Sequence, residues 1–168
     1  KGKGDKVYPL FIKNLNTGEI KEVPEVKNYQ LAEDKELLVL VSEGKDSTFE
    51  AGVYVYNLKE GQKTVIHKGK GKIEQLNIND TGDQVAFLAD MAEEKKKEEK
   101  YNLYVWDGAN EAKVIVMNQD LAFPGNWEIS KNASLSFSEN GKRLFFGTAP
   151  KSAPKDTTIL EEEIPVLD

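Results

Sequence analysis

The stretch Leu76–Phe87 reads LNINDTGDQVAF, and the stretch Leu135–Phe146 reads LSFSENGKRLFF. The two align without a gap, and each has an alternating segment, a short polar turn and an apolar segment. A third copy, Tyr29–Val39, aligns with them when one residue is deleted at the turn. Because alternation is typical of a strand with one buried face, each copy predicts an antiparallel hairpin of two strands, named a and b.

A second pattern lies between these hairpins. Val53–Asn57 reads VYVYN and resembles Leu103–Asp107, which reads LYVWD, and Leu10–Asn14 matches both. Each is followed by a turn and another β-rich segment, so each predicts a second pair of strands, named c and d. The turns between c and d are marked by Gly18, Gly61 and Gly108.

The turn between a and b carries a hairpin signal. Asn140-Gly141 stands between two β-rich runs, and this pair favours a type I′ turn because both central residues need positive φ. Thr81-Gly82 and Asp34-Lys35 occupy the same place in the other copies. The turn residues of those two copies give a weaker hairpin signal than Asn140-Gly141 does.

The strand order along the chain is c-d, a-b-c-d, a-b-c-d, a-b. Repeated four-stranded units are typical of propeller blades. We predict an all-β segment of a β-propeller, with a half blade c-d at 1–25, whole blades at 26–70 and 71–120, and a half blade a-b plus linker at 121–168. The unpaired strands at the two ends predict self-association, with a homodimer through exposed blade edges as one form.

The b and c strands are apolar at consecutive positions, as in Leu37–Val41 and Val85–Leu88. An antiparallel strand with two apolar faces needs a layer on each side, which stacked blades supply. A two-sheet sandwich is the alternative fold, although it would give alternation throughout. The residues expected in the core are Leu38, Val85, Phe87, Tyr104 and Phe145.

Composition narrows the functional classes. The 168 residues include no Cys, and the formal net charge of -6 argues against nucleic acid as a partner. No apolar run approaches the roughly 20 residues that span a bilayer. The chain starts with Lys1-Gly2-Lys3-Gly4 and no Met, so we expect it to be a piece of a longer protein.

Residues that could carry catalysis are scarce. His67 is the only histidine, and no G-x-S-x-G elbow occurs. We expect His67 to lie at the surface or at a blade edge, and we assign no catalytic residue. Lys68–Lys72, which reads KGKGK, lacks the spacing of a phosphate loop and is predicted to be a crossover between blades.

A metal or cofactor site is not expected either. Asn77, Asn79, Asp80 and Asp83 superficially resemble a calcium loop, but their spacing differs from the calcium-binding pattern. With one His and no Cys, the chain offers mainly oxygen ligands. We therefore assign no metal-binding and no cofactor-binding residue.

Three connections could form binding surfaces. The long polar segments Ser42–Glu50 and Met91–Lys100 join b to c. The second is predicted to be a solvated excursion from the blade rim, with a short helix supported by Glu93 and Lys97, or a docking patch, as the alternatives. Phe123–Trp127 is rich in aromatic residues. Trp127 could contact a ligand there, but we favour a role in filling the gap between adjacent blades.

The hairpin Phe137–Phe146 resembles the F-S-P-D-G-K-x-L-x-F hairpin of TolB-like propellers and of the propeller domains of the prolyl oligopeptidase family. Leu103–Asp107 resembles the L-Y-V-W-D strand of the same blades. The whole chain is similar to the N-terminal propeller of large exported bacterial peptidases of that family. Glu139-Asn140 replaces the Pro-Asp of the hairpin motif.

This resemblance implies a non-catalytic propeller segment that gates substrates and docks onto the hydrolase domain of an exported, periplasmic serine peptidase. The partners would be a peptide substrate and a downstream α/β-hydrolase domain, which carries the family's catalytic triad. No position here matches that triad. The alternative is a TolB-like propeller that binds protein partners without a peptidase domain, and a cytoplasmic location is the alternative to export.

Overall fold

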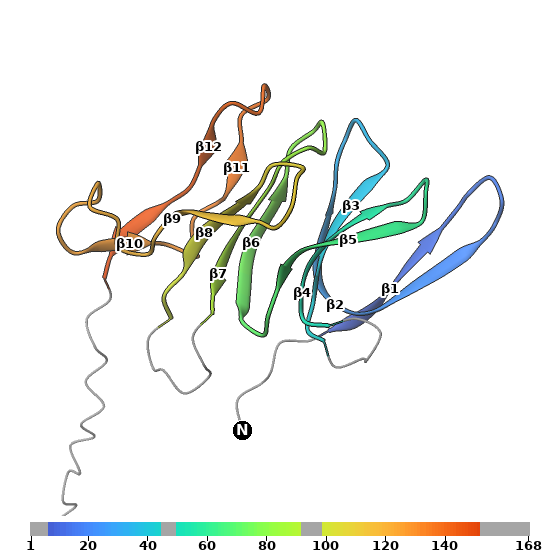
Figure 1. Cartoon of the computed structure of the whole chain (residues 1–168), viewed down its shortest axis with the longest axis horizontal. Helices are drawn as coiled ribbons and strands as arrows, with labels where there is room; N and C mark the ends of the chain where they lie inside the picture. Colours follow the sequence, from blue (N-terminus) through green and yellow to red (C-terminus); the bar gives the residue numbers. More distant parts are fainter. Residues whose placement is uncertain (1–6, 45–49, 92–98, 152–168) are drawn as a thin grey trace, which may run out of the picture.

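The computed structural model describes residues 7–44, 50–91 and 99–151, in which all regular structure is β-strand (Figure 1). The long polar segments between b and c fall largely on 45–49 and 92–98, and most of the linker falls on 152–168, all outside the described residues. The strands are β1 (Tyr8–Lys13), β2 (Ile20–Leu31), β3 (Leu37–Ser42), β4 (Gly52–Asn57), β5 (Gln62–Lys68), β6 (Lys72–Ile78), β7 (Val85–Asp90), β8 (Asn102–Trp106), β9 (Lys113–Val116), β10 (Trp127–Ile129), β11 (Ser136–Phe137), β12 (Leu144–Phe145) and β13 (Thr148–Pro150).

The strands form antiparallel sheets, none of them closed. The first sheet has the order β1-β2-β3-β4-β5, and the second has the order β6-β7-β8-β9. The pairs β11-β12 and β10-β13 form two further, two-stranded sheets. The all-β antiparallel class predicted from the sequence is therefore confirmed.

Strand β2 differs from the prediction. We expected separate d and a strands here, but one strand pairs with β1 along its first half and with β3 along its second. Glu25 has a positive φ of 54°, and the register with β3 shifts between Val26 and Asn28. Because the strand bends there without ending, it belongs to two neighbouring layers.

The three a-b hairpins have the same length, which corrects the deletion inferred in the first copy. The closing backbone bonds run from Ala32 N to Leu37 O, from Asn79 N to Gln84 O and from Ser138 N to Arg143 O, at 3.0, 3.1 and 2.8 Å. Residues of the first copy therefore correspond to the second without a gap, so that Leu40, and not Val39, corresponds to Phe87.

The expected type I′ turn at Asn140-Gly141 is also wrong. Gly141 has a φ of 64°, but Asn140 is not among the residues with positive φ. The Gly141 N–H donates to the carbonyl of Ser138 at 2.7 Å. The connection is longer than two residues, so it follows the other common solution, a turn closed by one left-handed glycine.

The sheets stack in four layers in chain order, from β1 with the first half of β2, through the two larger sheets, to β10–β13 (Figure 1). Three apolar clusters fill the interfaces between them. One lies between the two larger sheets and includes Val39, Val53, Ile66 and Phe87. The outer clusters centre on Leu40 and Tyr54 at one end and on Leu88 and Leu103 at the other.

The middle strands of the inner layers are covered on both faces. Val39 and Leu40 are consecutive and belong to different clusters, and both are 0% exposed. Ala86 and Phe87 are buried on opposite faces of the second sheet in the same way. A two-sheet sandwich would leave one face of each sheet without an apolar cover, so this stack does not have sandwich architecture.

The predicted core is confirmed in part. Leu38, Val85 and Phe87 are buried, and Tyr104 is half-buried against the cluster between the larger sheets. Phe145 is 55% exposed, so its prediction is wrong. It pairs with exposed Ser136 on the outer face of the last layer, whereas Leu144 packs inward.

The last hairpin is interrupted. We expected one pair of strands, but β10 pairs with β13 and β11 pairs with β12, with a loop between β10 and β11. The loop crosses closely over Gly147, where an added Cβ would lie 2.0 Å from the Cβ of Ala133. Because Gly147 has no side chain, the loop can pass close to it, while β10 pairs with β13 and β11 pairs with β12 on either side.

Candidate functional site

His67 lies between the two larger sheets, at the end of β5. Its ring centroid is 5.3 Å from that of Phe87 and 4.9 Å from that of Tyr104. The phenyl and phenol rings are stacked, with an interplanar angle of 6°. The half-buried His67 is therefore part of an aromatic contact between layers, which differs from the expected surface or edge position.

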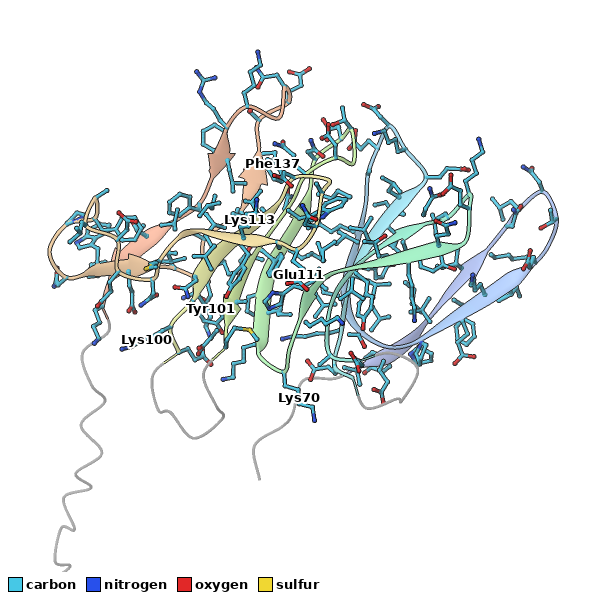
Figure 2. All side chains as sticks on the ribbon, viewed as in Figure 1. Lys70, Lys100, Tyr101, Glu111, Lys113 and Phe137 are labelled. Atoms are coloured by element: carbon cyan, nitrogen blue, oxygen red, sulfur yellow. The ribbon has the colours of Figure 1, made fainter. Side chains whose placement is uncertain are left out.

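The Nε2 atom of His67 lies 3.3 Å from the sulfur of Met91, at the end of β7. Two glycines of the β5–β6 crossover make room for this methionine. An added Cβ would lie 2.5 Å from Met91 Cε at Gly69 and 2.8 Å from Met91 Sδ at Gly71. The segment between β5 and β6 connects the two larger sheets, and Lys70 extends away from them (Figure 2).

The environment of His67 favours the neutral imidazole. Burial lowers the pKa of His67, and the charge of Glu111 opposes this shift. A general base in acyl transfer needs a nucleophilic hydroxyl at hydrogen-bond distance. Here the described partner of Nε2 is a thioether, so the geometry gives His67 a packing role.

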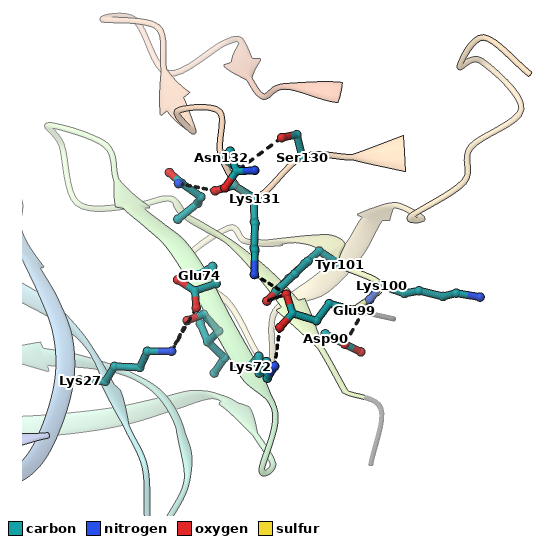
Figure 3. A network of polar contacts seen from close by, with 12 residues as sticks. Lys27, Lys72, Glu74, Asp90, Glu99, Lys100, Tyr101, Ser130, Lys131 and Asn132 are labelled. Carbon is teal, nitrogen blue, oxygen red and sulfur yellow. Dashed lines mark hydrogen bonds and ion pairs between the residues drawn. The ribbon is translucent and has the colours of Figure 1, made fainter. Parts of the chain in front are cut away.

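A polar network lies at one edge of the stack and centres on Glu99 (Figure 3). Its carboxylate forms ion pairs with Lys72 on β6 and with Lys131, which follows β10. The hydroxyl of Tyr101 donates to Glu99 Oε2 at 3.1 Å, and Lys131 Nζ lies 5.7 Å from the Tyr101 ring centroid. One carboxylate thus joins two neighbouring layers.

These contacts fix the protonation states in the network. Hydrogen bonds from Lys131 and then Lys72 lower the pKa of Glu99 to about 2. Burial and then the charge of Glu99 raise the pKa of Tyr101, so the phenol keeps its proton and donates it. The Glu99 carboxylate is occupied by Lys72, Lys131 and Tyr101, so we assign the network a structural role in holding the layers together.

Further contacts extend the network across the stack. Lys27 on β2 pairs with Glu74 on β6 at 3.2 Å, which connects the two larger sheets. The side-chain amide of Gln75 donates to the carbonyl of Lys131 at 2.7 Å, and Lys100 N donates to Asp90 at 3.1 Å. Sequence reasoning missed this network because its members are distant in sequence and share no motif.

The residues that resembled a calcium loop stabilise a hairpin turn. Asn79 Oδ1 accepts the backbone N–H groups of Asp83 and Gln84 at 3.1 and 3.0 Å, and its amide donates to Asp83 Oδ1 at 2.6 Å. Ser138 has the same place in the last hairpin, where its hydroxyl accepts the N–H of Arg143 at 3.0 Å. Across the described part of the chain, no group of three or more His, Asp or Glu side chains could hold a metal ion.

The aromatic segment Phe123–Trp127 is partly packed. Phe123 contacts the cluster between the last two layers, with its ring centroid 6.3 Å from that of Phe146. Trp127 is half-buried at the start of β10. The contact of Phe123 agrees with a packing role for this segment.

Large apolar side chains remain uncovered toward the two ends of the stack. Phe11 and Ile20 are each 60% exposed, Tyr29 is 49% exposed and Leu31 is 57% exposed, all on β1 and β2. Phe145 is exposed on β12, a strand at the opposite end of the stack (Figure 1). These two outer surfaces are the strongest candidates for binding surfaces.

No family model matches the chain, and no curated protein matches it. Within the ranges that the structure describes, there is also no helix of the length and apolar character needed to cross a membrane.

Proposed function

We propose that this chain is a non-catalytic segment of a β-propeller that gates substrates and provides a docking surface in an exported serine peptidase of the prolyl oligopeptidase family. The proposed blades are 26–70 and 71–120, flanked by half blades at 1–25 and 121–168. The proposal combines the layered architecture with the resemblance of the hairpins.

The observation that carries the proposal is the stacking of equivalent units. The second sheet follows the a-b-c-d order as β6-β7-β8-β9, and apolar clusters cover both of its faces. Blades around a propeller axis have this environment, because each blade packs between two others. The outermost layers each leave one apolar face for a further blade.

The residues around His67 support a non-catalytic role. Its ring packs against Phe87 and Tyr104, and its Nε2 faces Met91 Sδ. In a peptidase of this type the nucleophile and its base would belong to the separate hydrolase domain. The propeller would contribute selection of peptides by size and a surface on which the hydrolase domain docks.

The second candidate is a TolB-like propeller that binds protein partners. The hairpin Phe137–Phe146 resembles both groups, and the exposed Phe145 on this hairpin suits a protein contact. The two candidates differ in the parent polypeptide. A peptidase parent contains a G-x-S-x-G elbow in an α/β-hydrolase domain, and a scaffold parent does not.

The deciding experiment is to sequence the coding region downstream of residue 168 and assay the encoded protein with proline-containing chromogenic peptides. The peptidase proposal expects a G-x-S-x-G elbow and turnover that a serine-directed inhibitor abolishes. It also expects the 168-residue chain alone to be inactive. Inhibitor-sensitive turnover by the isolated chain, or a parent without a hydrolase domain, would overturn the proposal.

A further inference from the structure

The two outer layers of the stack are complementary halves of one unit. Strand β1 corresponds to β4, because the side chains of Asn14 and Asn57 at their ends each accept the backbone N–H groups two and three residues further along the chain. Strand β12 corresponds to β7, because each is the second strand of an a-b hairpin. One outer layer thus has c and d strands, and the other has a and b strands.

Each half has an edge with no neighbour among the described strands. Strand β1 pairs with β2 alone, and β12 pairs with β11 alone. In the complete units the b strand pairs with the c strand, as β3 does with β4 and β7 with β8. Strand β1 is therefore a c strand without a b partner, and β12 is a b strand without a c partner. Each could supply the partner that the other lacks.

The inner units also supply the register for this missing pairing. Leu40 lies opposite Tyr54, and Phe87 lies opposite Tyr104. Phe146 corresponds to Phe87, and Phe11 corresponds to Tyr54. The same pairing of β12 with β1 therefore sets Phe146 opposite Phe11, and by the same register Phe145 opposite Ile12.

We propose that the chain binds a second copy of itself by this pairing, so that β12 of one copy and β1 of the other complete a four-stranded unit. The two edges lie at opposite sides of the molecule, so one copy does not bring them together (Figure 1). Two copies can satisfy both edges reciprocally. The result is a closed dimer with two composite units, which leaves neither β1 nor β12 exposed as an edge.

The faces of the paired strands agree with this arrangement. Leu144 and Phe146 pack toward the second sheet, and Leu10 and Ile12 pack toward the first. In the proposed register Phe145 joins the face of Ile12, and Phe11 joins the face of Phe146. Each side chain therefore meets an apolar layer, and no strand has to rotate.

The burial of equivalent positions shows what the second copy would cover. Phe11, Tyr29, Leu31 and Phe145 are exposed, whereas the residues that occupy the same positions in complete units are buried. Those equivalents are Tyr54 at 3%, Leu76 at 3%, Ile78 at 7% and Ala86 at 0%. In the dimer the composite unit would cover Tyr29 and Leu31, and the larger sheets of the two copies on either side of it would cover Phe11 and Phe145.

The test is sedimentation velocity of the full 168-residue chain over a series of concentrations. We expect a monomer–dimer equilibrium, and we expect Phe11→Lys and Phe145→Lys each to raise the dimer dissociation constant about tenfold or more, because each introduces a charge on an apolar face. Leu15→Lys is the matched control, since Leu15 is 89% exposed in the β1–β2 turn and outside the paired edge. It should leave the constant unchanged.

Mixing the two defective variants tests the pairing itself. In a heterodimer of Phe11→Lys with Phe145→Lys, one composite unit contains both substitutions and the other contains neither. The unit without substitutions keeps its full pairing, and the doubly substituted unit can lose no more than its own contribution, so we expect the mixture to dimerise more tightly than either variant alone. Circular dichroism and thermal unfolding check that each variant is folded.

Three results would overturn the proposal. They are a monomer at all concentrations, association that Phe11→Lys and Phe145→Lys leave unchanged, and a mixture no tighter than its components. None of them bears on the peptidase assignment, which the downstream sequence decides separately.

Discussion

Glu99 and Lys131 form an ion pair between the segment that leads into β8 and the loop that follows β10. The other carboxylate oxygen of Glu99 pairs with Lys72 on β6. The last hairpin is thus attached to the second sheet by charge as well as by the apolar cluster around Leu103.

We expect Glu99→Gln to lower the free energy of unfolding at neutral pH by about 1 kcal/mol, because the side chain is partly exposed and water screens the pairs. The pKa of Glu99 is lowered from 4.5 to about 2, so its contribution is present above pH 4.5 and is lost as the pH falls toward 2. Urea titrations of the wild type and the variant should converge over that range. Exposed Glu33→Gln is the control, and a gap between wild type and Glu99→Gln that persists at the acid end would contradict the assignment.

Phe87→Ala should lower the free energy of unfolding by about 3–5 kcal/mol, since it removes a fully buried ring between two sheets. Phe145→Ala removes the same ring from an exposed position and should change stability by about 0.5 kcal/mol or less. Chemical denaturation of dilute samples, at which association is minimal, measures both. Equal effects would show that the register of β7 or of β12 is wrong.

Gly52→Ala should destabilise the first sheet, because an added Cβ would lie 2.2 Å from the backbone carbonyl oxygen of His67. Backbone atoms of a paired strand cannot move aside as a flexible side chain can, so we expect a loss of about 2 kcal/mol or more. Gly125→Ala is the control, since nothing lies within 4 Å of its added Cβ. Thermal unfolding of the two variants should separate them, and a Gly52→Ala variant as stable as the control would exclude this close approach.

His67 should titrate below its ordinary pKa of 6.5, because burial disfavours the imidazolium. The folded state binds the proton less readily than the unfolded state does. The free energy of unfolding is therefore not reduced by His67 above about pH 6.5, and it falls as the pH drops below that value. Since His67 is the only histidine, its NMR titration is unambiguous, and a measured pKa at or above 6.5 would refute the burial.

Much of the strand content could be predicted from the sequence, because apolar and polar residues alternate in strands with one buried face, as in Leu76–Ile78. The two-sided burial of Leu37–Val41 and Val85–Leu88 was visible for a related reason, since both faces are apolar. Phe145 shows the limit of this reasoning. Within Leu144-Phe145-Phe146 every residue is apolar, so composition cannot say which side chain faces outward, and the register decides.

Three other features could not be predicted from the sequence. The continuity of β2 depends on a bend at Glu25, a residue type that rarely has positive φ. The contacts of Glu99 join residues that are distant in sequence, and surface charges of this kind are frequent in any soluble β-protein. The site around His67 was placed wrongly because its partner, Met91, comes from another sheet.

Strand β2, which belongs to two layers, affects the order in which the layers unfold. In a stack whose layers contact only their neighbours, unfolding proceeds by loss of one layer at a time, and the weakest boundary opens first. The boundary at Glu25 is crossed by a continuous strand that pairs on one side with β1 and on the other with β3. The first two layers should therefore behave as one cooperative unit in native-state hydrogen exchange, and the interrupted β10–β13 hairpin should exchange first.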